Sequence, residues 1–182
     1  MADKSFIALP NRRIINVSGE DAREFLQGLI TNDMELVSEN RAVFAALLTP
    51  QGKYLHDFFI IENKHEFYID CEKDRVEDLI ERFSRYRLRA RVSIQDTGVE
   101  LTVYALTGKI KTLVDGLSIG EGRTKPFADG IVFEDPRTPA LGERAIIPSS
   151  MGNDCFEQLG FLELPLSDYD SLRYTLAIPQ GS

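Results

Sequence analysis

The sequence predicts an α+β fold made of two similar lobes, and three observations lead to this prediction. The chain has 182 residues, of which 43% are hydrophobic, enough to bury a core in one domain or in two small lobes. Short apolar runs that suit strands outnumber segments with helical spacing. The order of elements partly repeats after residue 98, without the strict strand–helix alternation of a doubly wound sheet. We therefore expect a first lobe over residues 1–96 and a second over residues 97–182.

The first lobe begins with a short strand at residues 12–17. Ser18 is a candidate N-cap for a helix with two carboxylates in its first turn, where they suit the positive helix end. Apolar residues then recur every three or four positions as far as Ile30, and the turn-forming residues 31–33 end the helix.

A hairpin and a second helix complete this lobe. Residues 42–48 are a nearly continuous apolar run, followed by the turn Thr49-Pro50-Gln51-Gly52. The remaining expected elements are strands at residues 54–61, 66–71 and 88–95 and an amphipathic helix around residues 76–83.

The second lobe is expected to repeat this pattern. Its predicted strands cover residues 100–106, 131–134 and 143–147, and its predicted helices cover residues 109–117, 153–159 and 168–177. In the loop between the last two strands, Asp135 and Arg137 are positioned to pair with each other, which we interpret as architecture.

Composition excludes several classes of protein. A net charge of -8 argues against general attraction to nucleic acid or anionic lipid, and no apolar run is long enough to span a bilayer. Two cysteines are too few for a disulfide framework, and the first residues lack the pattern of a secretory signal. We expect a reduced, cytoplasmic protein with no membrane partner and no strong nucleic-acid signal.

Two acidic residues inside apolar strands are the candidates for chemistry. His56 and Asp57 are adjacent, so only one of them can face the core or an enclosed cavity. An inward Asp57 would need a ligand or partner to bond its carboxylate, whereas the alternative is an edge-strand aspartate in water. The same two interpretations apply to Asp70, between Ile69 and Cys71.

The chain is acidic overall, but residues 82–91 form a basic segment that contains five arginines. On a strand, Arg87, Arg89 and Arg91 would share one face at a spacing of about 7 Å. Such a row suits a polycarboxylate tail or a phosphate backbone, and the alternative is a solvated face that pairs with the surplus acids.

Several longer motifs carry a family resemblance. The segments Val17-Ser18-Gly19-Glu20-Asp21-Ala22, Phe25 to Asp33, Leu48 to Lys53 and Asp57-Phe58 resemble the YgfZ-like folate-binding proteins, relatives of the glycine-cleavage T-protein (aminomethyltransferase). Asp135-Pro136-Arg137, Leu141 to Arg144, Tyr169 to Arg173 and Ile178 to Gly181 fit the same family. The resemblance covers nearly the whole chain and is closest to bacterial relatives of the mitochondrial iron–sulfur assembly factor.

This resemblance implies two interlocked lobes around a folate pocket and a role in iron–sulfur cluster assembly or repair, with an effect on tRNA modification. Asp57 takes the position of the catalytic acid beside the reactive folate nitrogen, and Asp70 that of a pterin-contacting residue. Asn32, Tyr169 and Arg173 are the other implied cofactor-binding residues, with Arg173 a candidate for the glutamyl tail.

The chain also departs from the family pattern. Thr175 stands where the T-protein has a pterin-clamping glutamate, and the chain has no tryptophan. The hallmark Lys-Gly-Cys-Tyr-x-Gly-Gln-Glu segment would lie downstream of Ser182, so we expect an N-terminal fragment without the C-terminal β domain.

Three functions follow as hypotheses. The first is an accessory protein for iron–sulfur cluster assembly that binds tetrahydrofolate or a derivative and works with assembly proteins or client enzymes. The second is an aminomethyltransferase that takes a one-carbon unit from a lipoyl carrier. The third is a nonenzymatic module that contacts protein or tRNA through the arginines. Whether the protein is an enzyme stays open at this point.

Overall fold

The computed structural model describes residues 4–108, 113 and 122–179, and it has the α+β architecture that the sequence predicts. The chain divides into two compact units. Unit 1 consists of Met1–Pro10 together with Val99–Ser182, and unit 2 consists of Asn11–Gly98. Among the described residues, no helix combines the length and the apolar character needed to cross a membrane.

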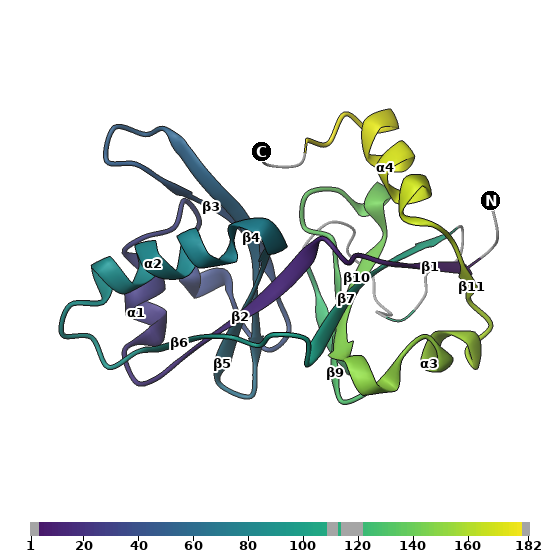
Figure 1. Ribbon diagram of the computed structural model, residues 1–182, viewed down its shortest axis with the longest axis horizontal. Helices are drawn as coiled ribbons and strands as arrows, with labels where there is room; N and C mark the ends of the chain where they lie inside the picture. Colours follow the sequence, from purple (N-terminus) through teal and green to yellow (C-terminus); the bar gives the residue numbers. More distant parts are fainter. Residues whose placement is uncertain (1–3, 109–112, 114–121, 180–182) are drawn as a thin grey trace. The chain divides into compact units, whose positions relative to one another are not determined.

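Unit 2 is an antiparallel sheet with the strand order β3-β4-β5-β2-β6 (Figure 1). Its elements are β2 (Arg12–Ser18), α1 (Ala22–Gln27), β3 (Val43–Leu48), β4 (Tyr54–Asn63), β5 (Glu66–Glu72), α2 (Val76–Arg87) and β6 (Ser93–Asp96). One face of the sheet packs against both helices around Phe83, whose ring centroid is 6.0 Å from that of Phe25 and 6.0 Å from that of Phe58. Burial of these rings holds the helices on the sheet.

Unit 1 is a mixed sheet with the order β11-β1-β7-β10-β9-β8, in which only the β1–β11 pair is parallel. Its elements are β1 (Lys4–Ala8), β7 (Leu101–Gly108), β8 (Thr124–Phe127), β9 (Gly130–Glu134), β10 (Glu143–Pro148), α3 (Asp154–Glu157), β11 (Leu162–Glu163) and α4 (Leu166–Thr175). Phe156 of α3 centres its core, with ring contacts to Phe6 at 5.1 Å and Tyr104 at 4.9 Å.

Short 3-10 helices link some of these elements, at Met34–Leu36, Lys73–Arg75, Pro139–Leu141 and Ser149–Met151.

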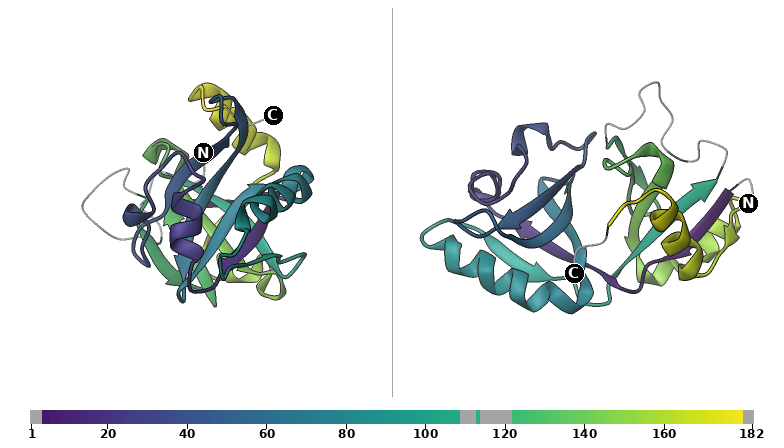
Figure 2. Two further views of the ribbon diagram at one scale, coloured as in Figure 1. Left: turned by 90° about the vertical axis from the view of Figure 1, so that its left-hand side faces the viewer. Right: turned by 90° about the horizontal axis from the view of Figure 1, so that it is seen from above.

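The chain passes from unit 1 into unit 2 and then returns to unit 1. β1 lies beside β7 and pairs with it from Lys4↔Gly108 to Ala8↔Tyr104, so the first residues belong to unit 1 although the segment after them forms unit 2 (Figures 1 and 2). The observed units therefore differ from the expected lobes 1–96 and 97–182 in the place of residues 1–10. Local periodicity does not reveal strand partners this far apart in the chain.

Several expected elements are present, but the expected strand at residues 88–95 is wrong over its first half. α2 continues to Arg87, and Leu88 then turns the chain with a φ of 44°. The strand β6 begins only at Ser93. The arginines at positions 87, 89 and 91 therefore do not form a row on a strand face.

The first helix also begins later than expected. Ser18 does not cap it, because Ser18 is the last residue of β2 and pairs with Ser93 of β6. Gly19 makes the turn with a φ of 119°, and the helix starts at Ala22. A Cβ at Gly19 would lie 2.2 Å from the Arg91 carbonyl oxygen, so the turn requires glycine. The helix expected at residues 109–117 falls outside the described residues, apart from residue 113.

Candidate functional site

The sheet register separates the two polar residues of β4. His56 lies on the helix-covered face with Phe58 and is buried, and its Nε2 is 2.6 Å from Oδ2 of Asp78 on α2. Asp57 points to the opposite face and is half-buried. β4 lies between β3 and β5 in the strand order, and Asp57 pairs with Ala46 of β3, whereas the ladder with β5 begins at Phe59. The Asp57 carboxylate lies on the face that the helices do not cover.

A β-bulge places a phenol beside this carboxylate. The register between β3 and β4 shifts at Leu47/Leu48, so Ala46 pairs with Asp57 while Leu48 pairs with Tyr54. Residues two apart share a face, and the shift therefore puts Tyr54 on the Asp57 side of the sheet. Burial raises the pKa of Tyr54, and the negative charge and hydrogen bond of Asp57 raise it further. The phenol stays protonated and can orient the carboxylate.

The second predicted acid, Asp70, is on the same face and is fully buried. It pairs with Phe59 of β4, two residues from Asp57. The Nε of Arg12 donates to Asp70 Oδ1 at 2.7 Å, and the Nη2 of Arg12 donates to the Asp70 backbone oxygen at 2.7 Å. The Arg12 guanidinium also lies 5.9 Å from the Phe59 ring centroid. Sequence reasoning did not identify Arg12 as this partner, because the pairing depends on the β2–β5 register.

Asn32 lies at the edge of the unit 2 sheet, apart from the two acids. Its Nδ2 donates to the Phe44 backbone oxygen at 2.9 Å, and its Oδ1 accepts from the Asp33 backbone nitrogen. The chain just before it runs along β3, since Ile30 bridges to Leu47. Both polar atoms of the amide thus have backbone partners that fix this segment.

The other two predicted residues, Tyr169 and Arg173, belong to unit 1. Tyr169 contacts a buried cluster of charged side chains. Tyr169 of α4 accepts hydrogen bonds from Arg144 at 2.9 Å and Arg137 at 3.3 Å. Asp135 joins these arginines, because its Oδ2 accepts from Arg137 Nη2 at 2.7 Å and from Arg144 Nε at 3.4 Å. The expected Asp135–Arg137 pairing is confirmed, and Arg144 is a member that the sequence did not reveal.

Arg173 lies one turn after Tyr169, with its guanidinium 5.9 Å from the Tyr169 ring centroid. Its Nη2 donates to Asp170 Oδ1 at 2.7 Å, and its Nη1 lies 3.4 Å from the Ile178 backbone oxygen. The Nε atom is buried and has no hydrogen-bond partner in the structure. A buried donor without an acceptor is costly, and the Nε atom of Arg41 has the same status.

The structure thus groups the predicted residues by unit. Asp57 and Asp70 share one sheet face of unit 2, with Asn32 at the edge of that sheet, and Tyr169 and Arg173 share one face of α4 in unit 1. Of these residues, Asp57 is half-buried, whereas Asp70, Tyr169 and Arg173 are buried and have protein partners.

Burial makes both cysteine thiols harder to deprotonate. Burial raises the pKa of the Cys71 thiol to about 12, and burial also raises the pKa of Cys155. Within the described part of the chain, no three His, Cys, Asp or Glu side chains are placed to hold a metal ion.

Comparison with known proteins identifies the class. The profile of the GCVT N-terminal domain matches residues 10–111, more than half of the chain, and the chain belongs to this family. The aminomethyltransferase of the glycine cleavage system from Bartonella henselae has the same fold, with a TM-score of 0.76 at 18% identity over 94% of this chain and 50% of that one. The resemblance to the T-protein superfamily is confirmed.

Within this class, the chain is similar to iron–sulfur cluster assembly factors named IBA57. It is 32% identical to the mitochondrial IBA57 homolog of Pyricularia oryzae over 97% of this chain and 43% of that protein. It is 28% identical to the mitochondrial human IBA57 over 95% of this chain and 50% of that protein. The chain therefore spans about half the length of these relatives or less.

These names overturn the expected cytoplasmic location, which is wrong by this comparison because the similar factors are mitochondrial. The expectation rested on the low cysteine count and the residues at the start of the chain. A low cysteine count indicates only that disulfides are not needed for folding, and does not distinguish one reducing compartment from another.

The buried Arg12–Asp70 pair generates a stability prediction. We expect Arg12→Ala to lower the free energy of unfolding by about 3–5 kcal/mol, because it leaves a buried carboxylate without its cation. Arg85→Ala is the control, since Arg85 and its partner Glu81 are both exposed, and we expect a loss below about 1 kcal/mol. Urea denaturation followed by circular dichroism measures both, and equal losses would contradict the structural role of the Arg12–Asp70 pair.

His56 generates a pH prediction. Burial lowers its pKa below the ordinary value of 6.5, and this outweighs the hydrogen bond to the Asp78 carboxylate, which raises the pKa. The unfolded state therefore binds the proton more readily, so the free energy of unfolding falls as the pH drops below 6.5. His56→Gln should remove this fall, whereas His65→Gln, at an exposed position, should retain it. Unfolding curves at a series of pH values measure this dependence. If the free energy of unfolding of His56→Gln falls with pH as steeply as that of the wild type, His56 is not the group responsible.

Proposed function

We propose that this protein acts in iron–sulfur cluster assembly and that it binds a tetrahydrofolate-type cofactor at the Asp57 face of unit 2. The observation that carries the assembly role is the 32% identity to an IBA57 homolog across 97% of this chain. The expected partners are iron–sulfur assembly proteins or client enzymes, and an effect on tRNA modification would act through such clients.

The Asp57 face supports the cofactor assignment. Tetrahydrofolate would supply a flat ring with N–H donors and a nitrogen that carries a one-carbon unit. The half-buried Asp57 carboxylate is an acceptor for such donors, and the protonated Tyr54 phenol holds it in orientation. Phe44, which pairs with Phe59 on the same face, adds a half-buried aromatic surface that suits a flat ligand.

The other residues take supporting roles in this proposal. Asp70 accepts a hydrogen bond from Arg12 through its Oδ1. This pair fixes the position of both side chains on the sheet face that carries Asp57. In unit 1, the assignment of Arg173 to the glutamyl tail stays a prediction from the family resemblance. Tyr169 positions Arg173 through its ring and accepts hydrogen bonds from Arg144 and Arg137.

The assembly role is tested in cells depleted of their own IBA57-type factor. Expression of this protein, directed to the compartment of the depleted factor, should restore the activity of iron–sulfur enzymes, and the exposed-site variant Asp154→Ala should restore it equally. Asp57→Ala should restore less than about one fifth of this activity if the carboxylate bonds the cofactor. Failure of the wild type would contradict the assembly role, and full rescue by Asp57→Ala would contradict the site alone.

Cofactor binding is tested on the purified protein. We expect tetrahydrofolate to bind, and Asp57→Ala to weaken binding by about tenfold or more, because a charged hydrogen bond to the ring is lost. Isothermal titration calorimetry measures the dissociation constant, and Asp154→Ala with an unchanged circular dichroism spectrum is the control. Unchanged affinity in Asp57→Ala would remove Asp57 from the site.

A further inference from the structure

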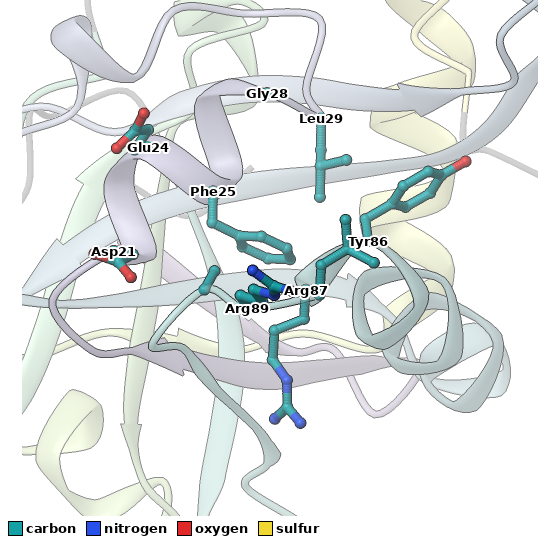
Figure 3. A pocket seen from close by; sticks show the side chains of 10 residues that line it. Asp21, Glu24, Phe25, Gly28, Leu29, Tyr86, Arg87 and Arg89 are labelled. Atoms are coloured by element: carbon teal, nitrogen blue, oxygen red, sulfur yellow. The ribbon is translucent and has the colours of Figure 1, made fainter.

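A groove on unit 2 is not used by the proposed site. It runs between the end of α1 and the end of α2 and is lined mainly by Phe25, Leu29, Tyr86, Arg87, Leu88 and Arg89, with a volume of about 480 Å³. We call it the α1–α2 groove. Figure 3 shows the Phe25 side chain coming from α1, Leu29 from the segment that follows α1, Tyr86 and Arg87 from the end of α2, Arg89 from the segment after α2, and Glu24 at the outer edge. The groove is open to solvent along its length, which suits an extended ligand better than a small enclosed one.

A strained and exposed leucine stands at its rim. Leu88 is 88% exposed and has a φ of 44°, a conformation that a branched side chain rarely adopts. Helices commonly end on a glycine with positive φ, but α2 has Leu88 at this position. An observed backbone outlier combined with an exposed large apolar side chain is typical of a contact surface.

The loop that presents Leu88 is fixed at its far end. The Arg91 backbone nitrogen donates to Asp21 Oδ2 at 2.8 Å, and the Arg91 guanidinium pairs with the same carboxylate at 3.2 Å. The Arg91 carbonyl lies against Gly19, where no side chain would fit. The start of α1 thus holds the loop in place, so the exposed position of Leu88 does not require a mobile segment.

The charges around the groove define the chemistry of an occupant. Three neighbouring arginines have carboxylate partners: Arg82 with Asp78, Arg85 with Glu81, and Arg91 with Asp21. Among the described residues, Arg87 and Arg89 have no carboxylate within ion-pair distance, and Arg87 has only a 3.4 Å contact to the Val92 backbone oxygen. In a chain of net charge -8, two unpaired guanidiniums beside an apolar groove are complementary to carboxylates set among apolar side chains.

We propose that the α1–α2 groove is a docking site for an acidic, amphipathic segment of a partner protein. The apolar side chains of that segment pack on Phe25, Leu29 and Leu88, and its carboxylates pair with Arg87 and Arg89. Nucleic acid fits less well, because Asp21 and Glu24 lie on the α1 side of the groove and the net charge repels a phosphate backbone.

The first test uses defined probes on the purified protein. A fluorescein-labelled peptide with leucines at helical spacing and glutamates between them should bind about tenfold more tightly than its lysine counterpart and than a single-stranded oligonucleotide. Arg87→Glu combined with Arg89→Glu should weaken binding by about tenfold, and Leu88→Ser should also weaken it. Arg85→Glu is the matched control, because Arg85 lies on α2 but does not line the groove. Equal affinity for both peptides, tighter oligonucleotide binding, or unchanged binding in the groove variants would overturn the proposal.

The second test maps the natural occupant. A photo-crosslinking residue at position 88 should give, in cells, an adduct whose attached peptide is acidic and amphipathic by mass spectrometry. The same residue at position 99, where Val99 is 82% exposed in unit 1, should not give this adduct. The double arginine variant should reduce the adduct about tenfold. An adduct with RNA, with a second copy of this chain, with a non-acidic segment, or no adduct at all would contradict the assignment.

Discussion

Strict alternation along β4 is the constraint on which the candidate site depends. Neighbouring residues of a strand face opposite sides of its sheet, so the burial of His56 against α2 fixes Asp57 on the other side. The bulge at Leu47/Leu48 changes this alternation by one residue and thereby places Tyr54 next to Asp57. A slip of one residue in the hairpin would exchange the two faces, so the turn at residues 49–52 is as important to the site as the acid itself.

Both units stabilise a buried carboxylate by pairing it with an arginine. Unit 2 buries Asp70 with Arg12, and unit 1 buries Asp135 with Arg144, so each carboxylate removed from water has a guanidinium beside it. The groups that stand out are those that this pairing leaves incomplete. Among the described residues, the Nε atoms of Arg41 and Arg173 are buried without a hydrogen-bond partner, and the exposed side chains of Arg87 and Arg89 have no carboxylate partner.

Sequence reasoning reached the fold class and the strands β2 to β5 because short apolar runs bounded by turns are local features, and it reached the family through motifs along nearly the whole chain. It missed β1, β8 and β11, which are short and depend on distant partners. It placed Asp57 and Asp70 in strands correctly but did not identify Arg12 or Asp78 as partners, since a register links residues that no spacing connects. The arginine row failed for a local reason: α2 extends to Arg87, because its apolar spacing and charges continue to favour helix.

The pairing of β1 with β7 has a consequence for the order of events during synthesis. β1 leaves the ribosome before unit 2, yet its partner β7 is made only after all of unit 2. Closing so long a loop of unfolded chain is entropically costly, and compaction of the intervening residues shortens the distance to be closed. Unit 2 can therefore fold before β1 pairs with β7, and the six-stranded sheet of unit 1 is completed after unit 2.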